Sequence, residues 1–480
     1  MNVSKLPPEV LGDIFHWNVT LNNDFGGLEE GSHNFLLVCR HWFEVASSTP
    51  EVWSFWGNTP KDWARWCHRS GTAPLDLVLN VKGGGDFFGA ALFRVLQDHA
   101  NGNTIRRIHL KATNPDLLRS LISSLTTTSK ELQLSSVESF IFRNGGNELV
   151  DVSDFFTHHC YPRLQRLELF TCKISSWDLI TSRVTALTTL DLALFSLQPI
   201  PTISQLLSIL TSNPTLQKVS LSVGAAPDDG SRNPPPRVSL CHLKEFKLDG
   251  YPQDIFWLLD RLEFPRHMDN LDITLYGCTV EDVSQIIGPY LRDYLQHCGR
   301  SPGGLGLSRS SQRNVELEVG DAGGIDFSVP APARVTVFMK ISIEFNQTLF
   351  DGRMVEMTLD LIAHVPREEI VYFRVCGKPP AMEEVSARLP NLRGLHFERT
   401  PISATFPKAN IDGDGEIFRC LQYIYLDRAV VGGDGWRPLI TFLLWRARSG
   451  RLLHSLVIAG SYRTLPNISQ GAVREFRLIR

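Results

Sequence analysis

Two adjacent histidines are followed directly by a cysteine in the first half of the chain, at His158-His159-Cys160, and Cys172 comes twelve positions later. Imidazole and thiolate groups are preferred zinc ligands, and a structural zinc site usually takes its four ligands from two closely spaced pairs. No second pair accompanies this cluster at such a spacing. Neighbouring histidines on a helix also point in different directions. We therefore predict structural or surface roles for these side chains and no metal site.

Two glycine-containing stretches are the next candidates for chemistry. Residues 412–416, Asp-Gly-Asp-Gly-Glu, resemble part of a calcium loop, but the later ligands and the closing glutamate are missing at the required spacing. Residues 83–86, Gly-Gly-Gly-Asp, lack the flanking pattern of a nucleotide-binding loop. We predict a polar turn for the first stretch and a loop after a strand for the second.

The sequence also lacks the short motifs of common enzymes. It contains no G-x-S-x-G, no phosphate-binding P-loop and no H-E-x-x-H. We therefore predict that the protein is not an enzyme and uses no cofactor. An active site assembled by folding from scattered carboxylates and histidines remains an open hypothesis, which a deep pocket with acids or histidines of perturbed pKa would favour.

Size and charge limit the remaining classes of protein. A chain of 480 residues exceeds the usual size of one hydrophobic core, which predicts several domains or an elongated array of repeats. Lysine and arginine number 48 against 51 acidic residues. No overall basic field therefore exists to attract nucleic acid or an anionic membrane, although a local basic patch stays possible.

Cysteine usage and hydropathy concern the compartment. The 9 cysteines include no CxxC pair, which predicts reduced, mostly buried thiols. The N-terminus lacks an apolar run of secretory type, and no stretch approaches the ~18 apolar residues that cross a bilayer. We predict a cytoplasmic or nuclear protein that is neither secreted nor bound to a membrane.

Two apolar patterns near the N-terminus predict helices. Pro7 and Pro8 can open a helix, because the amides of a first helical turn have no intrahelical partner. A second helical pattern follows and should end at Pro50. The apolar positions of the first helix are Val10, Leu11, Ile14 and Phe15, and those of the second are Leu37, Val38, Trp42, Val45 and Ala46.

These segments resemble an F-box of the fungal, basidiomycete type. The matching pieces are LPPEVLGDIF at residues 6–15, VCRHW at 38–42 and ASSTPEVW at 46–53. The polar, glycine-containing stretch 20–34 makes this module longer than a compact F-box and leaves its middle helix open. The resemblance implies a three-helix module at residues 1–60 that docks on a Skp-type adaptor of a cullin ubiquitin ligase. The adaptor-binding residues it implies are Leu6, Pro7, Glu9, Val10, Leu11, Ile14, Phe15, Leu37, Val38, Cys39 and Trp42.

Residues 61–80 are predicted to connect this module to the rest of the chain. Trp63 and Trp66 lie on a predicted helix that ends at Ser70-Gly71. Alternating leucines at positions 75, 77 and 79 then predict a half-buried strand. The order of F-box, tryptophan-bearing helix and strand is similar to the start of the repeat domain in fungal F-box proteins. We expect Trp63 and Trp66 to lie in the core between the module and the first repeat.

A short pattern, apolar-x-x-apolar-x-apolar, recurs along the rest of the chain and predicts a series of strands. From residue 105 to 268 its first positions lie 23 to 32 residues apart, close to the ~20–29 residues of leucine-rich repeats. The first residues of the copies are Ile105, Val137, Leu164, Leu187, Leu216, Leu243, Met268, Leu392, Leu421 and Leu453.

Helical patterns separate many of these strands, for example at residues 114–128, 201–213 and 440–450. One strand and helix cannot bury both of their faces alone, so neighbouring units must stack. We predict an α/β fold in which the helical F-box module precedes an irregular leucine-rich-repeat-like solenoid at residues 81–480, with loops near 224–237 and 298–333.

The resemblance and the repeats together imply a function. The chain would be the substrate receptor of a cullin-type (SCF) ubiquitin ligase, with the repeats holding an unknown target protein. The alternative is a ligase-independent interaction scaffold in which the F-box-like end merely caps the solenoid. Burial of Val10 and Ile14 against the repeats would favour the cap.

Overall fold

A computed structural model covers the chain and divides it into two compact units. The first comprises Met1–Leu243 and Arg261–Pro265, and the second Lys244–Asp260 and Arg266–Arg480. The structure describes residues 6–24, 34–56, 65–66, 68–81, 105–128, 134–146, 148–194, 201–223, 237–265, 268, 270–278, 289, 315–321, 339–345, 370–376, 382–406, 417–431, 435–460 and 471–479. The predicted loop near 224–237, apart from Arg237, and the glycine-rich stretches at 83–86 and 412–416 lie outside these residues.

The first unit contains a parallel sheet in the strand order β1-β2-β3-β4-β6-β8-β9. Its strands are β1 (Phe55–Trp56), β2 (Leu75–Val81), β3 (Ile105–Ala112), β4 (Ser139–Asn144), β6 (Arg166–Phe170), β8 (Thr189–Leu194) and β9 (Lys218–Val223). Two small parallel pairs accompany it, β5 (Val150–Asp151) with β7 (Cys172–Lys173) and β10 (Val238–Ser239) with β12 (Leu262–Glu263).

Helices of the first unit precede the sheet or connect its strands. The N-terminal ones are α1 (Pro8–Asp24), the 3-10 turn η2 (Asn34–Leu37), α2 (Arg40–Ser48) and α3 (Pro50–Trp53). The connecting ones are α6 (Pro115–Thr128), η3 (Leu134–Ser136), α7 (Ser153–His158), α8 (Asp178–Arg183) and α9 (Ile203–Ser212). A capping box in which Thr202 and Gln205 exchange hydrogen bonds starts α9.

The second unit is also built on parallel strands, in the order β11-β13-β15-β14-β16-β17-β18-β19-β20. β15 therefore lies between β13 and β14, against the order of the chain. The strands are β11 (Glu245–Gly250), β13 (Asn270–Cys278), β14 (Val315–Asp321), β15 (Met339–Phe345), β16 (Ile370–Cys376), β17 (Gly394–Glu398), β18 (Tyr423–Asp427), β19 (Leu453–Ala459) and β20 (Val473–Ile479). The helices are α10 (Pro252–Leu259), α13 (Met382–Arg388), α14 (Ile402–Thr405) and α15 (Arg437–Arg448).

The recurrent apolar motif predicted the strands correctly, because each of its ten copies falls on or directly before one of them. In the copy at β6, for example, Leu164 directly before the strand and Leu167 and Leu169 within it are all fully buried. The strand at residues 75–81 differs from its prediction. It was expected to be half-buried, but Asp76 and Val78 on its second face are buried as well.

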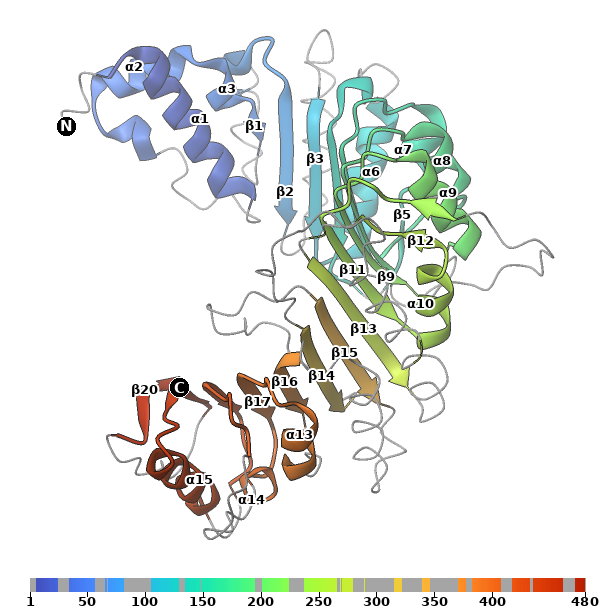
Figure 1. Cartoon of the computed structure of the whole chain (residues 1–480). Helices are drawn as coiled ribbons and strands as arrows, with labels where there is room; N and C mark the ends of the chain where they lie inside the picture. The colour runs from blue at the N-terminus through green and yellow to red at the C-terminus, as the bar shows by residue number, and fades with distance from the viewer. Residues whose placement is uncertain are drawn as a thin grey trace, which may run out of the picture. The chain divides into compact units, whose positions relative to one another are not determined.

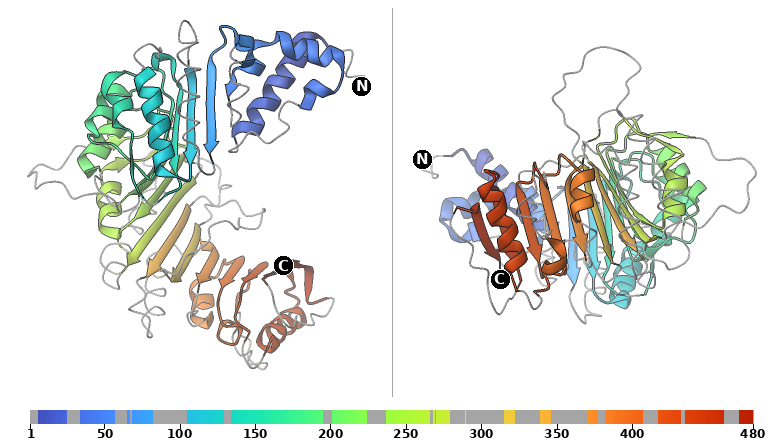
Figure 2. Two further views of the ribbon diagram at one scale, coloured as in Figure 1. Left: turned by 180° about the vertical axis from the view of Figure 1, so that it is seen from behind. Right: turned by 60° about the horizontal axis from the view of Figure 1, so that its bottom comes forward.

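The motif side chains point toward the helices. Phe140 and Phe142 of β4 pack against Phe155 of α7, with ring centroids 5.6 and 5.1 Å away, and Phe140 also contacts Tyr161. Figure 1 and the left view of Figure 2 show α6 to α9 together on one face of the first unit's sheet. Because strand side chains alternate, Ser139, Ile141 and Arg143 lie on the opposite face of β4. We call this the open face; among the described residues, no helix of the first unit covers it.

One turn recurs directly after the strands of both units. Thr171, Arg399 and Arg428 have φ of 52°, 51° and 48°, and Gly460 has φ of 116°. Each of these residues directly follows a strand, and each donates its N–H to a carbonyl at the end of the next strand in the sheet. The bonds are Thr171 N to Ala193 O at 3.1 Å, and Arg399 N to Asp427 O, Arg428 N to Ala459 O and Gly460 N to Ile479 O at 2.9 Å each.

The side chain after this turn is also used alike in the two units. The Cys172 thiol donates to the carbonyls of Phe142 and Phe170, at 3.7 and 3.3 Å. The Thr400 hydroxyl donates to Val375 and Glu398 at the corresponding positions, at 3.4 and 2.9 Å. Each side chain thereby hydrogen-bonds to the end of its own strand and to the preceding strand. This favours the same spacing between successive strand-and-helix units.

Helices long and apolar enough to cross a membrane do not occur among the described residues.

Candidate functional site

The helices α1 and α2, with η2, enclose a small core of their own. Leu11, Phe15 and Val19 follow one another at helical spacing in α1 and are 0–1% exposed. Phe15 stacks on Phe35 of η2 with ring centroids 4.5 Å apart, and it contacts Trp42 of α2 at 5.1 Å. We call the residues from Leu6 to Trp53 the N-terminal helical module.

The neighbouring face of α1 carries large apolar side chains that point into solvent. Val10, Ile14 and Trp17 are spaced by four and three residues and are 42, 46 and 64% exposed. Leu37 and Val38, just after Phe35, are 84 and 59% exposed. Ile14 directly precedes Phe15, Leu37 and Val38 closely follow Phe35, and the two phenylalanine rings stack on each other. The exposed residues of α1 and those at the end of η2 and directly after it therefore both lie next to the Phe15–Phe35 pair. We call these five residues the exposed apolar surface of the module.

The structure separates the residues that the F-box resemblance implied into three groups. Leu11 and Phe15 are buried, so they hold the module together and are not available for direct contact with a partner. Leu6 and Trp42 are half-buried. The exposed ones are Pro7, Glu9, Val10, Ile14, Leu37, Val38 and Cys39.

Two further exposed aromatic residues belong to the same module but were not among those candidates. Trp17 continues the spacing of Val10 and Ile14 along α1, so helical periodicity alone could have identified it. Phe43 in α2 is 44% exposed, directly after the half-buried Trp42. Exposed large apolar residues that gather on one module are typical of protein interaction sites.

The module is fixed to the sheet through its third helix. Pro50 was predicted to end the second helix, but α2 already ends at Ser48, and Pro50 opens α3, where a first-turn proline is favourable. The Trp53 indole donates to the carbonyl of Ala46 at 2.7 Å. The chain then forms β1, whose Phe55 and Trp56 pair with Asp76 and Leu77 of β2 and are 2 and 1% exposed.

The structure describes one of the two tryptophans that were predicted to lie in the core. Trp66 is buried, as expected, whereas Trp63 lies outside the described residues. The helical residues 68–70 end where predicted, at Gly71, whose φ of 56° suits glycine. Nearby, the Arg69 guanidinium lies over the Trp53 ring, 4.4 Å from its centroid.

The cysteine and histidine cluster does not form a metal site in the described part of the chain, where no group of three potential ligands comes together. Cys160 is exposed, and Cys172 is buried. Burial raises the pKa of the Cys172 thiol to about 12, so it stays protonated and acts as a hydrogen-bond donor. The prediction of mostly buried thiols was wrong for the described free cysteines, because Cys39, Cys160 and Cys241 are exposed.

One histidine and serine pair on the open face invites a catalytic interpretation. His109 Nε2 lies 2.8 Å from Ser139 Oγ. Burial lowers the pKa of His109 to about 3, and the charges of Arg166, Arg107 and Arg143 act in the same direction. A general base works best with a pKa near the operating pH. An imidazole with so low a pKa is a weak acceptor of the serine proton, and the pair is better suited to a structural role.

Comparisons with known proteins do not identify a family for the chain. No protein-family model matches the chain, and no curated protein sequence matches it. One similar solved structure is described as "Crystal structure of TLR13-ssRNA13 complex", with a TM-score of 0.28 and 12% sequence identity over 87% of this chain and 52% of that one. The chain thus spans about half the length of the protein it matches, and a TM-score this low carries no argument about the chain.

Proposed function

We propose that the chain is the substrate receptor of a cullin-type ubiquitin ligase. The N-terminal helical module acts as an F-box that binds a Skp-type adaptor, and the strand-and-helix units form a leucine-rich-repeat-like solenoid that holds a target protein. The chain contributes proximity, since ubiquitin transfer becomes effectively intramolecular once target and charged enzyme share one scaffold.

The observation that carries this proposal is the division of α1 into two apolar faces. A cap would bury its apolar residues against the sheet. Leu11 and Phe15 are buried, but in the core of the helical module itself. Val10 and Ile14, which the cap hypothesis requires to be buried, remain 42 and 46% exposed. A helix that has already completed its core and still presents apolar side chains is expected to bind a partner.

The repeated turn after the strands supports the second half of the proposal. Cys172 and Thr400 occupy the position where leucine-rich repeats carry a side chain that bonds to neighbouring backbone, and both do so here. Arrays of such units offer extended surfaces that bind other proteins.

Binding to a purified Skp-type adaptor tests the docking half directly. Isothermal titration of the whole chain should give a complex, and the double variant Val10→Asp/Ile14→Asp should bind roughly tenfold more weakly or worse, because each aspartate places a charge in an apolar contact. The matched control is Val430→Asp/Leu452→Asp, at residues that are 52 and 39% exposed in the second unit. This control should bind the adaptor as the wild type does.

Two results would count against the ligase receptor. If the wild-type chain does not bind the adaptor, the alternative of a ligase-independent scaffold takes its place. If Val10→Asp/Ile14→Asp binds as tightly as the wild type while retaining its melting temperature, the exposed apolar surface is not the contact.

A further inference from the structure

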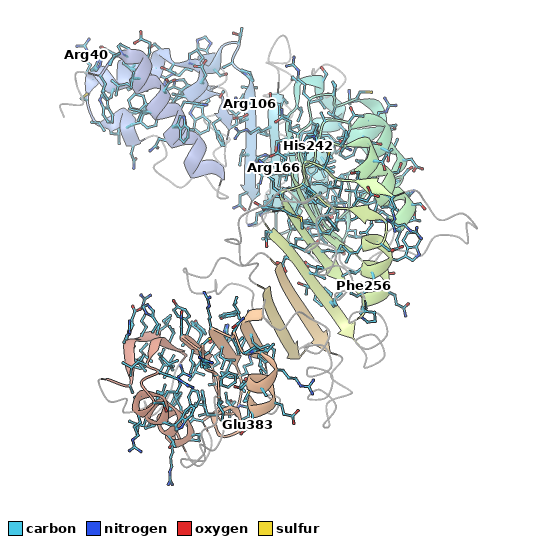
Figure 3. All side chains as sticks on the ribbon, viewed as in Figure 1. Arg40, Arg106, Arg166, His242, Phe256 and Glu383 are labelled. Carbon is cyan, nitrogen blue, oxygen red and sulfur yellow. The ribbon has the colours of Figure 1, made fainter. Side chains whose placement is uncertain are left out.

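The open face of the first unit carries arginine and lysine side chains in register. Arg107 of β3 is aligned with Ser139 of β4 and, through it, with Arg166 of β6. Four residues further along β3, Lys111 is aligned with Arg143 of β4. With strands ~4.8 Å apart and ~3.3 Å per residue, these four cations fall within roughly 10 by 13 Å. We call them the basic patch; Figure 3 labels one of them, Arg166.

Carboxylates are present on this face, but they lie beneath the cations. The Asp76 side chain is fully buried and accepts hydrogen bonds from Arg106 at 2.9 and 2.6 Å, with Arg107 at 3.9 Å. The Glu168 side chain is 4% exposed and pairs with Arg143 at 2.7 Å and with Arg166 at 2.5 Å. Asp191 is half-buried next to Glu168 in the ladder.

The outer surface is therefore positive although acids lie below it. The side chain of Arg107 is 25% exposed, and those of Arg143 and Arg166 are 42 and 43% exposed. Lys111 is exposed as well. Burial and, after it, the charges of the three arginines of the patch lower the pKa of His109, which lies among them.

The corresponding face of the second unit is closer to balance. Arg374, Arg399 and Arg428 surround the buried Glu398, at 2.6, 4.0 and 3.1 Å, and Arg428 also lies 3.4 Å from Asp427. Arg374 is itself buried, with 4% of its side chain exposed. Among the described residues around Glu398, the accessible Arg399 and Arg428 therefore share their charge with Glu398 and Asp427, and we place the ligand of opposite charge on the first unit.

We propose that the basic patch binds an acidic, extended segment of a protein partner through its carboxylates. This proposal rests on the proposed function, in which such a segment belongs to the target. Arginine pairs with carboxylates in a planar, two-bond geometry. Side chains on one face of an extended segment recur about every 6.6 Å, so two such steps span the roughly 13 Å of the patch along the strands. Complementary charge of this kind selects partners and speeds their encounter.

Single-stranded nucleic acid fits the patch less well. Such ligands depend on aromatic rings against which bases stack. The aromatic residue within the patch is Phe170, and the Arg143 guanidinium already covers its ring at 4.5 Å.

Fluorescence anisotropy with a labelled peptide of alternating glutamate and serine tests the proposal on the whole chain. Its controls are the same peptide with glutamine for glutamate and a single-stranded RNA of equal length. The variant Lys111→Glu should weaken binding of the acidic peptide roughly tenfold, and Arg107→Gln should weaken it less. Arg107→Gln leaves Asp76 paired with Arg106, so the fold is expected to persist.

The matched control is Arg119→Glu on α6, an arginine whose side chain is 43% exposed like that of Arg166 but which lies away from the open face. It should bind the acidic peptide as the wild type does. Equal binding of the acidic and glutamine peptides, equal binding by Lys111→Glu and wild type, or tighter binding of the RNA would each overturn the proposal. Adaptor binding measured on the same variants keeps the two proposals apart, because Lys111→Glu should leave it unchanged.

Discussion

At the scale of single residues, His109 is the group whose protonation the fold opposes most clearly. Its pKa falls from 6.5 to about 3, chiefly through burial and also through three arginine charges. In the unfolded chain the same imidazole takes up a proton near its ordinary pKa. Between these two values the unfolded state binds more protons than the folded state, so stability falls as the pH falls.

Replacement of His109 by glutamine should flatten this pH dependence. Glutamine can still hydrogen-bond to Ser139 but does not titrate, so the wild type should lose about 2 kcal/mol more than His109→Gln between about pH 7 and pH 5. Urea unfolding of both proteins at the two pH values measures the difference. His242→Gln, at an exposed histidine that Figure 3 labels, should keep the wild-type slope, and an equal slope for His109→Gln would contradict the expected role of His109.

Sequence patterns at this scale show which positions of the first helix are apolar but not which of them face the core. Val10, Leu11, Ile14 and Phe15 form one apolar stripe in the sequence, yet the structure buries the second and fourth and exposes the first and third. A helical stripe of this width can face two surfaces, and which surface is internal depends on Phe35 and Trp42, which come from other elements. No local pattern contains that information.

At the scale of elements, the apolar strand motif and the turn that follows the strand recur together in both units of the chain. The spacing of Leu392, Leu395 and Phe397 predicted β17 correctly, because a strand that packs on helices with one face must place apolar side chains there. The turn that follows was not predicted, since residues as different as Thr171, Arg399 and Gly460 adopt it. Nor did any pattern predict that β15 lies between β13 and β14, which depends on pairing between distant segments.

Gly460 is the copy of this turn that should depend most on its residue type. Its φ of 116° lies beyond the left-handed region that Thr171, Arg399 and Arg428 occupy, and a side chain there is strained. Gly460→Ala should lower the free energy of unfolding by about 1–3 kcal/mol. Chemical denaturation measures this loss. Gly145→Ala, where the added Cβ would meet only ordinary contacts at 3.4 Å, should change it little, and equal effects would show that backbone strain is not the cause.

At the scale of the first unit as a whole, covering the edge of the sheet and the proposed docking fall to different residues. The cap is formed by β1, directly after the N-terminal helical module, where Phe55 and Trp56 are buried and cover the edge of β2. The proposed docking surface lies in α1 of the module, where Val10 and Ile14 are exposed. The sequence shows one apolar stripe in this region, so the cap and the docking module were alternatives there. Since the cap and the exposed residues are separate in the structure, the two hypotheses do not exclude each other.

Removal of residues 1–56 should therefore destabilise the chain, whereas point variants of the exposed apolar surface should not. Truncation uncovers the edge of β2 and deletes the burial of Phe55 and Trp56, each worth roughly 1.5–3 kcal/mol, so the melting temperature should fall and the free strand edge should promote association. Val10→Asp/Ile14→Asp should retain the wild-type melting temperature, because its side chains already lie in solvent. Thermal unfolding and size-exclusion chromatography of both proteins make the comparison. A truncated chain as stable and monomeric as the wild type would show that β1 is not needed as a cap, and a destabilised double variant would show that the two tasks share the same residues.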